Sequence, residues 1–319
     1  MRRRGIGAMA KRAFQLLFFP AVLLLAAYLI WRISRQYKLD EVLDAVGSIP
    51  PGRLMLAIAF AGLSYLCLTA FDWLAVRYVG RRLPWRQTAL ASFIALSMGH
   101  NLGFAAFSTG AIRYRFYSRW GLSNGEVVKV IVFCALTVGL GLMILGGAAL
   151  VLAPGLASEY TRLPRALVLL VGWGCLGLAA AYLVVSVFDW RPVRIGRHAV
   201  YVPPFHLALG QAIIGPLNFA CVAACLSQGV AAVQEVSSLA VAASYVIANV
   251  TAMISHVPGG LGVIESVILF LMGGGPVIGA LLVFRIVYYL VPLAFGGSAF
   301  VLIELGLLMR SRRADRRRS

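Results

Sequence analysis

Nine apolar runs, several of them as long as a bilayer is thick, take up most of this 319-residue chain. A helix needs roughly 20 apolar residues to cross the hydrocarbon core of a membrane. The charged fraction is 13%, against about 25% in a soluble domain. The runs are 14–31, 54–76, 88–107, 127–153, 165–188, 205–229, 236–255, 263–275 and 276–309. The sequence predicts an all-α polytopic membrane protein, with residues 1–319 forming a single integral membrane domain.

Two of the apolar runs are interrupted where an ordinary membrane helix would continue. One interruption lies between Ser97 and Arg113 and the other between Asn249 and Glu265, and both end in Gly-x-Ile followed by a charge. Unwound backbone at membrane depth is tolerated only where protein buries it or where it lines a wet cavity. Matching interruptions in the two halves of a transporter point to its binding site. These two predict a polar path through the membrane and suggest an inverted repeat.

The net charge of +18 comes from cations in short segments that flank the apolar runs. This is the positive-inside pattern, so the expected partners are anionic phospholipid headgroups and not nucleic acid. The basic segments 1–13 and 310–319 therefore predict that both termini are cytoplasmic. Run 14–31 is interpreted as a retained first helix, because no small-residue cleavage site precedes Arg32.

The basic segments on both sides of run 88–107 conflict with a full crossing, because each favours the cytoplasm. A re-entrant hairpin that enters and leaves on the cytoplasmic side removes the conflict. The same reasoning places a second hairpin over 236–275, entering from the outer face. We expect six to eight transmembrane helices, with six if two opposed re-entrant hairpins form. Counting every run as a crossing gives eight or nine.

The last run, 276–309, is too long for one straight helix, and we expect Pro292 with Gly296 and Gly297 to bend or split it.

Arg285 is the clearest charged residue inside an apolar run, where a charge costs roughly 2.5–3.5 kcal/mol. It is either a clamp for a phosphate or carboxylate, or a buried partner of Glu265 or Glu304. The two readings are compatible if Glu265 releases Arg285 when substrate arrives. Tyr288 follows one turn later and offers a hydroxyl donor.

The second interruption contains residues that are typical of a moving gate, namely a carboxylate at a helix start and several glycines. Glu265 stands at the expected start of a helix, where a carboxylate either caps the helix or couples transport to protons or cations. Glycine lets the backbone approach closely and hinge. The predicted gating residues are His256, Pro258, Gly259, Gly260, Gly262 and Glu265. A histidine such as His256 or His100 is more often a hydrogen-bonded residue than a titrating switch.

The first interruption leads into Arg113, Arg115 and Arg119, which alternate with aromatic residues. This pattern is typical of an interfacial anchor. Alternatively, Arg113 gathers an anionic headgroup at the cytoplasmic mouth of the path. Asp72 is also expected at an interface. The predicted substrate-contacting residues are Asn101, Arg113, Ser255, Arg285 and Tyr288.

Sequence motifs for chemistry are missing. There is no Walker loop, no Gly-x-Ser-x-Gly elbow, no paired-carboxylate motif and no Glu-x-x-His or His-x-x-x-His pair. All five cysteines fall inside apolar runs and are expected to be small core residues. The sequence therefore predicts no catalytic residue, no metal site, no cofactor and no use of nucleotide hydrolysis.

Two longer strings of residues resemble a known family. Gly110-Ala-Ile-Arg-Tyr-Arg-Phe-Tyr-Ser118, with Gly121-Leu122 after it, and Ser255-His-Val-Pro-Gly-Gly-Leu-Gly-Val-Ile-Glu265 look like signatures of the lysylphosphatidylglycerol synthase transmembrane-domain family. That family includes the flippase region of the bacterial multiple peptide resistance factor and stand-alone proteins of about this length.

The resemblance implies a multi-pass protein of the bacterial inner membrane that moves a phospholipid between leaflets, aminoacylated phosphatidylglycerol among the candidates. We expect no transferase activity in this chain, so a lysyltransferase name inherited from the family would not apply. Two alternatives stay open: a membrane subunit that presents lipid to a separate aminoacyl- or glycosyl-transferase, and a small-solute or ion transporter. A homodimer is compatible with each of them.

Overall fold

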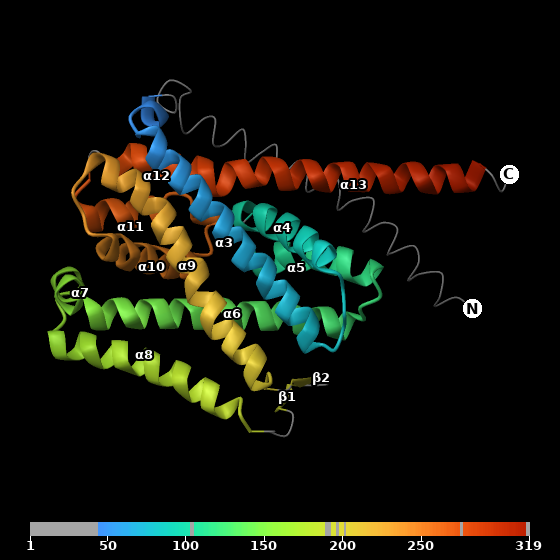
Figure 1. The fold of residues 1–319 in the computed structure, drawn as a ribbon, viewed down its shortest axis with the longest axis horizontal. Helices are drawn as coiled ribbons and strands as arrows, with labels where there is room; N and C mark the ends of the chain where they lie inside the picture. Colours follow the sequence, from blue (N-terminus) through green and yellow to red (C-terminus); the bar gives the residue numbers. More distant parts are fainter. Residues whose placement is uncertain are drawn as a thin grey trace.

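The computed structural model describes residues 44–102, 105–188, 193–195, 198–200, 202–274 and 277–316. The predicted first helix, 14–31, and the basic segment 1–13 lie outside the described residues. The elements are α3 (Pro51–Tyr78), α4 (Trp85–Leu102), α5 (Ala105–Arg119), α6 (Asn124–Leu152), α7 (Pro154–Thr161), α8 (Arg165–Val185), β1 (Val193–Ile195), β2 (His198–Val200), α9 (Phe205–Val233), α10 (Ser238–Ser255), η1 (Pro258–Gly260), α11 (Val263–Met272), α12 (Val277–Arg285), η2 (Ile286–Leu290) and α13 (Val291–Arg316) (Figure 1).

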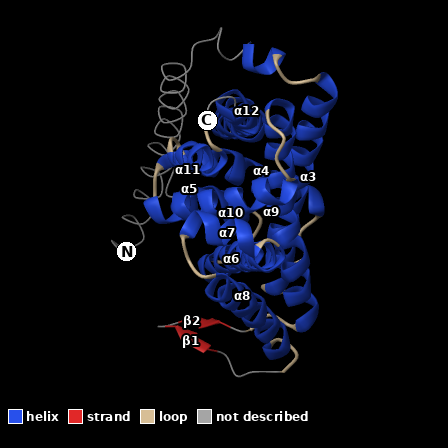
Figure 2. Cartoon of the chain, turned by 90° about the vertical axis from the view of Figure 1, so that its left-hand side faces the viewer, coloured by secondary structure: helices blue, strands red, loops and turns tan. Residues whose placement is uncertain are grey.

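The predicted fold class, an all-α polytopic membrane protein, is confirmed. Within the described residues six helical segments are long and apolar enough to cross a membrane. They are α3, α6, α8, α9, α10 and the segment Val277–Leu307, which joins α12 to α13. Five of them match predicted crossings, whereas α10 was predicted as one arm of the second hairpin. The only strands described, β1 and β2, form a short antiparallel pair (Figure 2).

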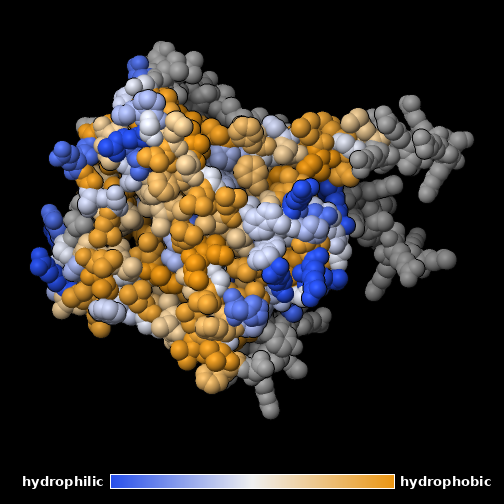
Figure 3. Space-filling model, viewed as in Figure 1, coloured by the Kyte–Doolittle hydropathy of each residue, from blue (hydrophilic) through white to orange (hydrophobic). Residues whose placement is uncertain are grey.

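The centre of the molecule is the antiparallel pair α3 and α9, which make the most extensive helix–helix contact. Leu74, near the end of α3, lies beside Gly210, near the start of α9. Ala57, near the start of α3, meets Gly229, near the end of α9, at a small apolar cavity. Apolar side chains cover much of the outer face of this pair (Figure 3), as expected of a surface that faces lipid.

Helices α4 and α5 form the first hairpin. They pack so closely that a Cβ on Gly99 would lie 2.1 Å from Cγ2 of Thr109. The segment before α4 and the start of α6 are joined by an ion pair, with 2.8 Å between Nε of Arg81 and Oε1 of Glu126. The hydrogen bond and the charge of Glu126 raise the pKa of Arg81. The chain therefore enters and leaves the first hairpin at the same end.

Helices α10 and α11 form the second hairpin. Its base is held by Gln234, whose Nε2 donates to the carbonyl oxygen of Met272 at 3.3 Å. The first hairpin follows the end of α3, and the second follows the end of α9. Because α3 and α9 are antiparallel, the two hairpins enter the bundle from opposite ends. A long helix, a hairpin and a second long helix thus follow one another twice along the chain, and the two sets run through the bundle in opposite directions. That the hairpins re-enter a membrane stays a prediction.

The helix over 277–316 changes at Ile286–Leu290, a π-helical turn directly before Pro292. Of the three residues expected to bend or split this helix, Pro292 is the one next to the change. Pro292 lacks the N–H that would bond to the carbonyl of Tyr288 in an α-helix. The carbonyl of Tyr288 instead accepts from the Tyr65 hydroxyl at 3.4 Å, and that of Tyr289 accepts from Nδ2 of Asn101 at 3.3 Å.

Gly296 has a different role from the one predicted. A Cβ at this position would lie 1.9 Å from Oγ of Ser97, so the glycine allows α13 to pack tightly on α4.

Candidate functional site

The tips of the two hairpins meet inside the bundle. A Cβ on Gly259, in the turn of the second hairpin, would lie 3.5 Å from the carbonyl oxygens of His100 and Asn101 near the end of α4. The two interruptions of the sequence therefore come together in the fold. Residues 103–104, between α4 and α5, lie outside the described residues.

The turn of the second hairpin depends on its glycines. Gly259, Gly260 and Gly262 have φ angles of 63°, 57° and 81°, which side chains rarely adopt. His256 is also left-handed, at 53°, and ends α10. The result is a compact loop in which the carbonyl groups of Gly259 and Gly260 reach the last residue of α12, which explains the Pro-Gly-Gly-Leu-Gly sequence.

Arg285 fills this loop. Its side chain is 6% exposed. Nη1 donates to the carbonyl of Gly259 at 2.5 Å, and Nη2 donates to the carbonyl of Gly260 at 2.9 Å. Nε and Nη2 bond to the two carboxylate oxygens of Glu265, the second at 2.9 Å. The guanidinium also lies over the Tyr289 ring, 4.7 Å from its centroid.

Glu265 has two structural roles. One oxygen accepts the N–H of Gly262 at 2.9 Å, which caps the start of α11. The same carboxylate neutralises Arg285 in a bidentate pair. Of the two predicted acidic partners of Arg285, the structure selects Glu265.

The first hairpin carries a second buried pair. Arg113 of α5 donates from Nε and Nη2 to the two oxygens of Asp72, at 2.9 and 2.8 Å. The Tyr117 hydroxyl donates to the same carboxylate at 2.7 Å. Asp72 is 0% exposed and Arg113 is 4% exposed. The expectation that Arg113 is a surface anchor is wrong, because α3, α5 and their neighbours enclose it together with Asp72. The interfacial depth expected for Asp72 stays a prediction.

Glu304 of α13 forms a third cluster with two arginines. Arg115 donates from Nε to Oε1 at 2.7 Å and from Nη2 to Oε2, and Arg119 donates to the same two oxygens at 3.0 and 3.3 Å. Glu304 is 3% exposed. These bonds hold α5, the second arm of the first hairpin, against α13.

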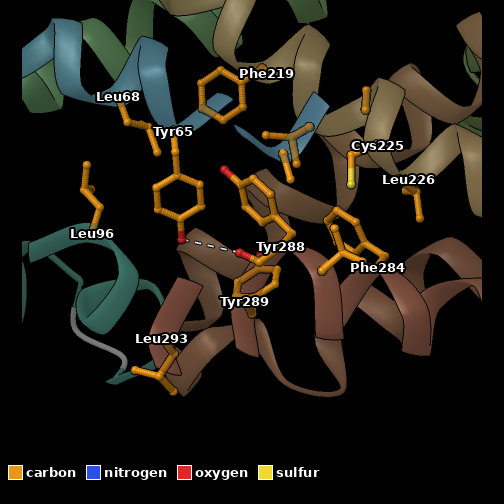
Figure 4. Close-up of a cluster of buried hydrophobic side chains, with 14 of the residues drawn as sticks. Tyr65, Leu68, Leu96, Phe219, Cys225, Leu226, Phe284, Tyr288, Tyr289 and Leu293 are labelled. Atoms are coloured by element: carbon orange, nitrogen blue, oxygen red, sulfur yellow. Dashed lines mark hydrogen bonds between the residues drawn. The ribbon is translucent and has the colours of Figure 1, made fainter. Parts of the chain in front are cut away.

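Buried aromatic side chains, among them Tyr65, Phe284 and Tyr288, form a cluster in the core of the bundle (Figure 4). The Tyr288 hydroxyl is 3.0 Å from Oγ of Ser64, which donates to Oδ1 of Asn218 at 2.7 Å. The Tyr288 ring stacks on His100, with 6.3 Å between centroids. Among the described residues Nδ1 of His100 has no hydrogen-bond partner. We call this group of side chains the polar seam; it includes Ser64, Tyr65, His100, Asn218 and Tyr288. It connects α3, α4, α9 and the π-helical turn.

Three residues of this seam were not predicted from the sequence, namely Ser64, Tyr65 and Asn218. The signal that was available is a hydroxyl or amide inside an apolar run, which singles out residues in need of a partner.

Not every predicted site residue joins these clusters. The Ser255 hydroxyl is exposed and donates to the carbonyl of Ala252, and His256 is exposed beside the carbonyl of Ile254. Arg113 and Arg285 belong to separate pairs with separate acids. Asn101 lies near the tips and links α4 to the π-helical turn. The side chain of Pro258 lies outside the described part.

The described residues hold no group of three or more His, Cys, Asp or Glu side chains able to hold a metal ion. What the arrangement offers is the guanidinium group of Arg285, which is held by two backbone carbonyls and by Glu265 at the meeting point of the two hairpins. A guanidinium group binds a carboxylate or a phosphate through two parallel N–H bonds.

Comparison with known proteins agrees with this architecture. The family described as "Lysylphosphatidylglycerol synthase TM region" matches residues 19–296. An uncharacterized protein of Synechocystis, slr0712, is 32% identical over 288 residues, which cover 89% of this chain and 88% of that protein. Inner membrane protein YbhN of Escherichia coli is 29% identical over 311 residues, 93% of each chain. The chain therefore belongs to the lysylphosphatidylglycerol synthase transmembrane-region family.

Proposed function

We propose that this protein is a flippase of the bacterial inner membrane, which moves a phospholipid between leaflets without nucleotide hydrolysis. The observation that supports this most directly is the meeting of two opposed hairpins, with Arg285 held in the glycine loop of one of them. The family takes its name from the synthase of a phospholipid, and one relative is called an inner membrane protein. Both names are consistent with a lipid substrate and this membrane.

In the proposed mechanism the hairpins are re-entrant and bring polar backbone to the middle of the membrane. Arg285 exchanges the carboxylate of Glu265 for the phosphate of a headgroup, while the acyl chains stay in lipid. Arg285 keeps an anion and two hydrogen bonds throughout the exchange, because a carboxylate and a phosphate each accept two parallel N–H bonds. A guanidinium without any anion would be costly at this depth, so the pair closes again when the lipid leaves.

Gly259, Gly260 and Gly262 provide the backbone freedom for the loop to open. The carbonyl bonds from Arg285 to Gly259 and Gly260 tie this opening to α12. Asn101 and Tyr288 lie on the path between the two tips. His256 and Ser255, exposed at the end of α10, are candidates for contact with an arriving headgroup.

The test is lipid movement in liposomes that contain the purified protein. Fluorescent phosphatidylglycerol in the outer leaflet is bleached by dithionite, and the rate at which inner-leaflet lipid becomes accessible is measured. We expect Arg285→Ala and Glu265→Gln to slow movement by about tenfold or more, since each removes charge-assisted bonds worth about 1.5–3 kcal/mol.

The matched control is Arg81→Gln, which removes an arginine–carboxylate pair from the surface, where Arg81 is 48% exposed. This variant should move lipid at the wild-type rate. All proteins are compared by size-exclusion profile before reconstitution, so that an unfolded variant is not scored as an inactive one. Wild-type protein that moves lipid no faster than Arg285→Ala or Glu265→Gln contradicts the mechanism.

The family name also favours a second candidate, a membrane subunit that presents lipid to a separate aminoacyl- or glycosyl-transferase. This candidate predicts that a transferase is recovered with the protein after gentle solubilisation. A small-solute or ion transporter would instead take up solute into vesicles without moving lipid. Mass spectrometry of the lipid retained by the purified protein identifies the substrate in the first two cases.

A further inference from the structure

The Glu304 cluster differs from the other buried pairs in its charge. Asp72 neutralises one arginine and Glu265 neutralises one arginine, but Glu304 faces both Arg115 and Arg119. The cluster therefore carries one positive charge more than its carboxylate can balance. Glu304 and Arg115 have side chains only 4% and 12% exposed, whereas the side chain of Arg119 is 31% exposed, so the excess charge reaches solvent through Arg119.

Donor groups remain on both arginines. Arg115 uses Nε and Nη2, and Arg119 uses Nη1 and Nη2, to reach Glu304. Among the described residues no partner is found for Nη1 of Arg115 or for Nε of Arg119. Guanidinium groups with free N–H donors and incomplete neutralisation are a binding feature for an anion.

Ser118 adds a third group on the same side of α5. Positions 115, 118 and 119 have the i, i+3 and i+4 spacing that places side chains on one helix face. Oγ of Ser118 is buried, and it has no hydrogen-bond partner among the described residues. A buried hydroxyl without a partner is unusual and calls for a ligand or water.

We propose that Arg115, Ser118 and Arg119 bind one phosphate group. A tetrahedral phosphate offers several acceptor oxygens, enough for two guanidinium groups and a hydroxyl. The carboxylate of Glu304 already occupies one side of the cluster, so the phosphate would bind on the other side. The ligand enters from the side of Arg119, whose side chain is 31% exposed. Both a phospholipid headgroup and free phosphate carry this chemistry. The site does not depend on the transport proposal.

The experiment measures binding to the full-length protein in detergent by isothermal titration calorimetry. One arm uses inorganic phosphate, and the other uses dihexanoyl phosphatidylglycerol, with a dihexanoyl glycerol that lacks phosphate as the blank. Binding in the first arm only identifies free phosphate as the source, and binding in the second only identifies the lipid. Absence of binding in both arms overturns the proposal.

Variants locate the site. Arg119→Gln should weaken binding by about tenfold or more, because it removes the excess charge and two or more donors. Ser118→Ala should weaken it by about fivefold, as expected for one neutral hydrogen bond. Glu304→Gln should strengthen binding, because it removes the competing negative charge. Arg81→Gln, at an exposed pair, should leave binding unchanged.

The opposite signs expected for Arg119→Gln and Glu304→Gln separate a specific site from a loss of folding, which would weaken binding in both variants. Equal losses in Arg119→Gln and Arg81→Gln would show that binding follows net charge alone, and the proposal would be wrong.

Discussion

Arginine–carboxylate pairs dominate the buried polar chemistry of this protein at the scale of single residues. Arg113 and Arg285 each bond both oxygens of one acid, and each acid has a further donor, Tyr117 or the N–H of Gly262. A pair of this kind contributes little net stability compared with apolar residues, but removal of one partner leaves a buried charge without compensation.

The residue-scale prediction concerns Asp72, which is fully buried. Asp72→Asn should lower the free energy of unfolding by about 3–5 kcal/mol, because Arg113 then lacks its counter-charge. The double variant Asp72→Asn with Arg113→Gln should be more stable than Asp72→Asn alone. Thermal unfolding in detergent, followed by the fraction that stays monodisperse, measures both variants. A double variant less stable than the single one would contradict this account of the pair.

At the scale of elements, glycine decides how closely the hairpins approach the long helices. Gly296 lets α13 lie against Ser97 of α4, and Gly141 of α6 meets the backbone of Gly215 in α9. The π-helical turn adds a second device, because it turns the carbonyls of Tyr288 and Tyr289 toward donors on α3 and α4. Close approach holds α4 to α13, and the freed carbonyls hold the π-helical turn to α3 and α4.

The element-scale prediction compares neighbouring glycines. Gly296→Ala should lower the unfolding free energy by about 1–3 kcal/mol, because its Cβ would overlap Ser97 and force α4 and α13 apart. Gly297→Ala is the control, since a Cβ there meets nothing within 4 Å. It should be neutral or slightly stabilising, because alanine favours the helix. Equal melting temperatures for the two variants would show that the packing at Gly296 is not limiting.

At the scale of the whole molecule, the two hairpins have their bases at opposite ends of the bundle and their tips in contact. Arg81 with Glu126 marks one base, and Gln234 with Met272 marks the other. If the hairpins are re-entrant, the two residues flanking each hairpin face the same side of the membrane. Basic residues around the first base predict that this side is the cytoplasm.

The whole-molecule prediction uses single cysteines in a variant without the five native ones. Cysteines at Arg82 and Asn124, which flank the first hairpin, should both react with a membrane-impermeant maleimide from the cytoplasmic side. Cysteines at Glu235 and Gly273, which flank the second, should both react from the outer side. Labelling of intact cells and of inside-out vesicles measures this. A pair whose two members label from opposite sides would show that the hairpin is a full crossing.

Much of the candidate site was predictable from residue type alone. A lone arginine in an apolar run needs an anion, and repeated glycines after a proline require a turn, so Arg285, Glu265 and the loop were predicted. The sequence did not predict whether Arg285 pairs with Glu265 or with Glu304, because both acids lie near α12 along the chain. The burial of Asp72 was not predicted, because its sequence neighbours, Trp73 and Arg77, resemble an interface, whereas its partners Arg113 and Tyr117 come from α5.

The sequence by itself determined that the chain is a helical membrane protein and where its helices break, because hydropathy, proline and glycine act locally along the chain. Tertiary structure alone decided which arginine forms an ion pair with which acid. It also decided that Gly259 lies close to the carbonyls of His100 and Asn101. It also decided that the helix over 277–316 changes at a π-helical turn. These features depend on contacts between residues far apart in sequence, which are set by the packing of α3 against α9 and by the approach of the two hairpin tips.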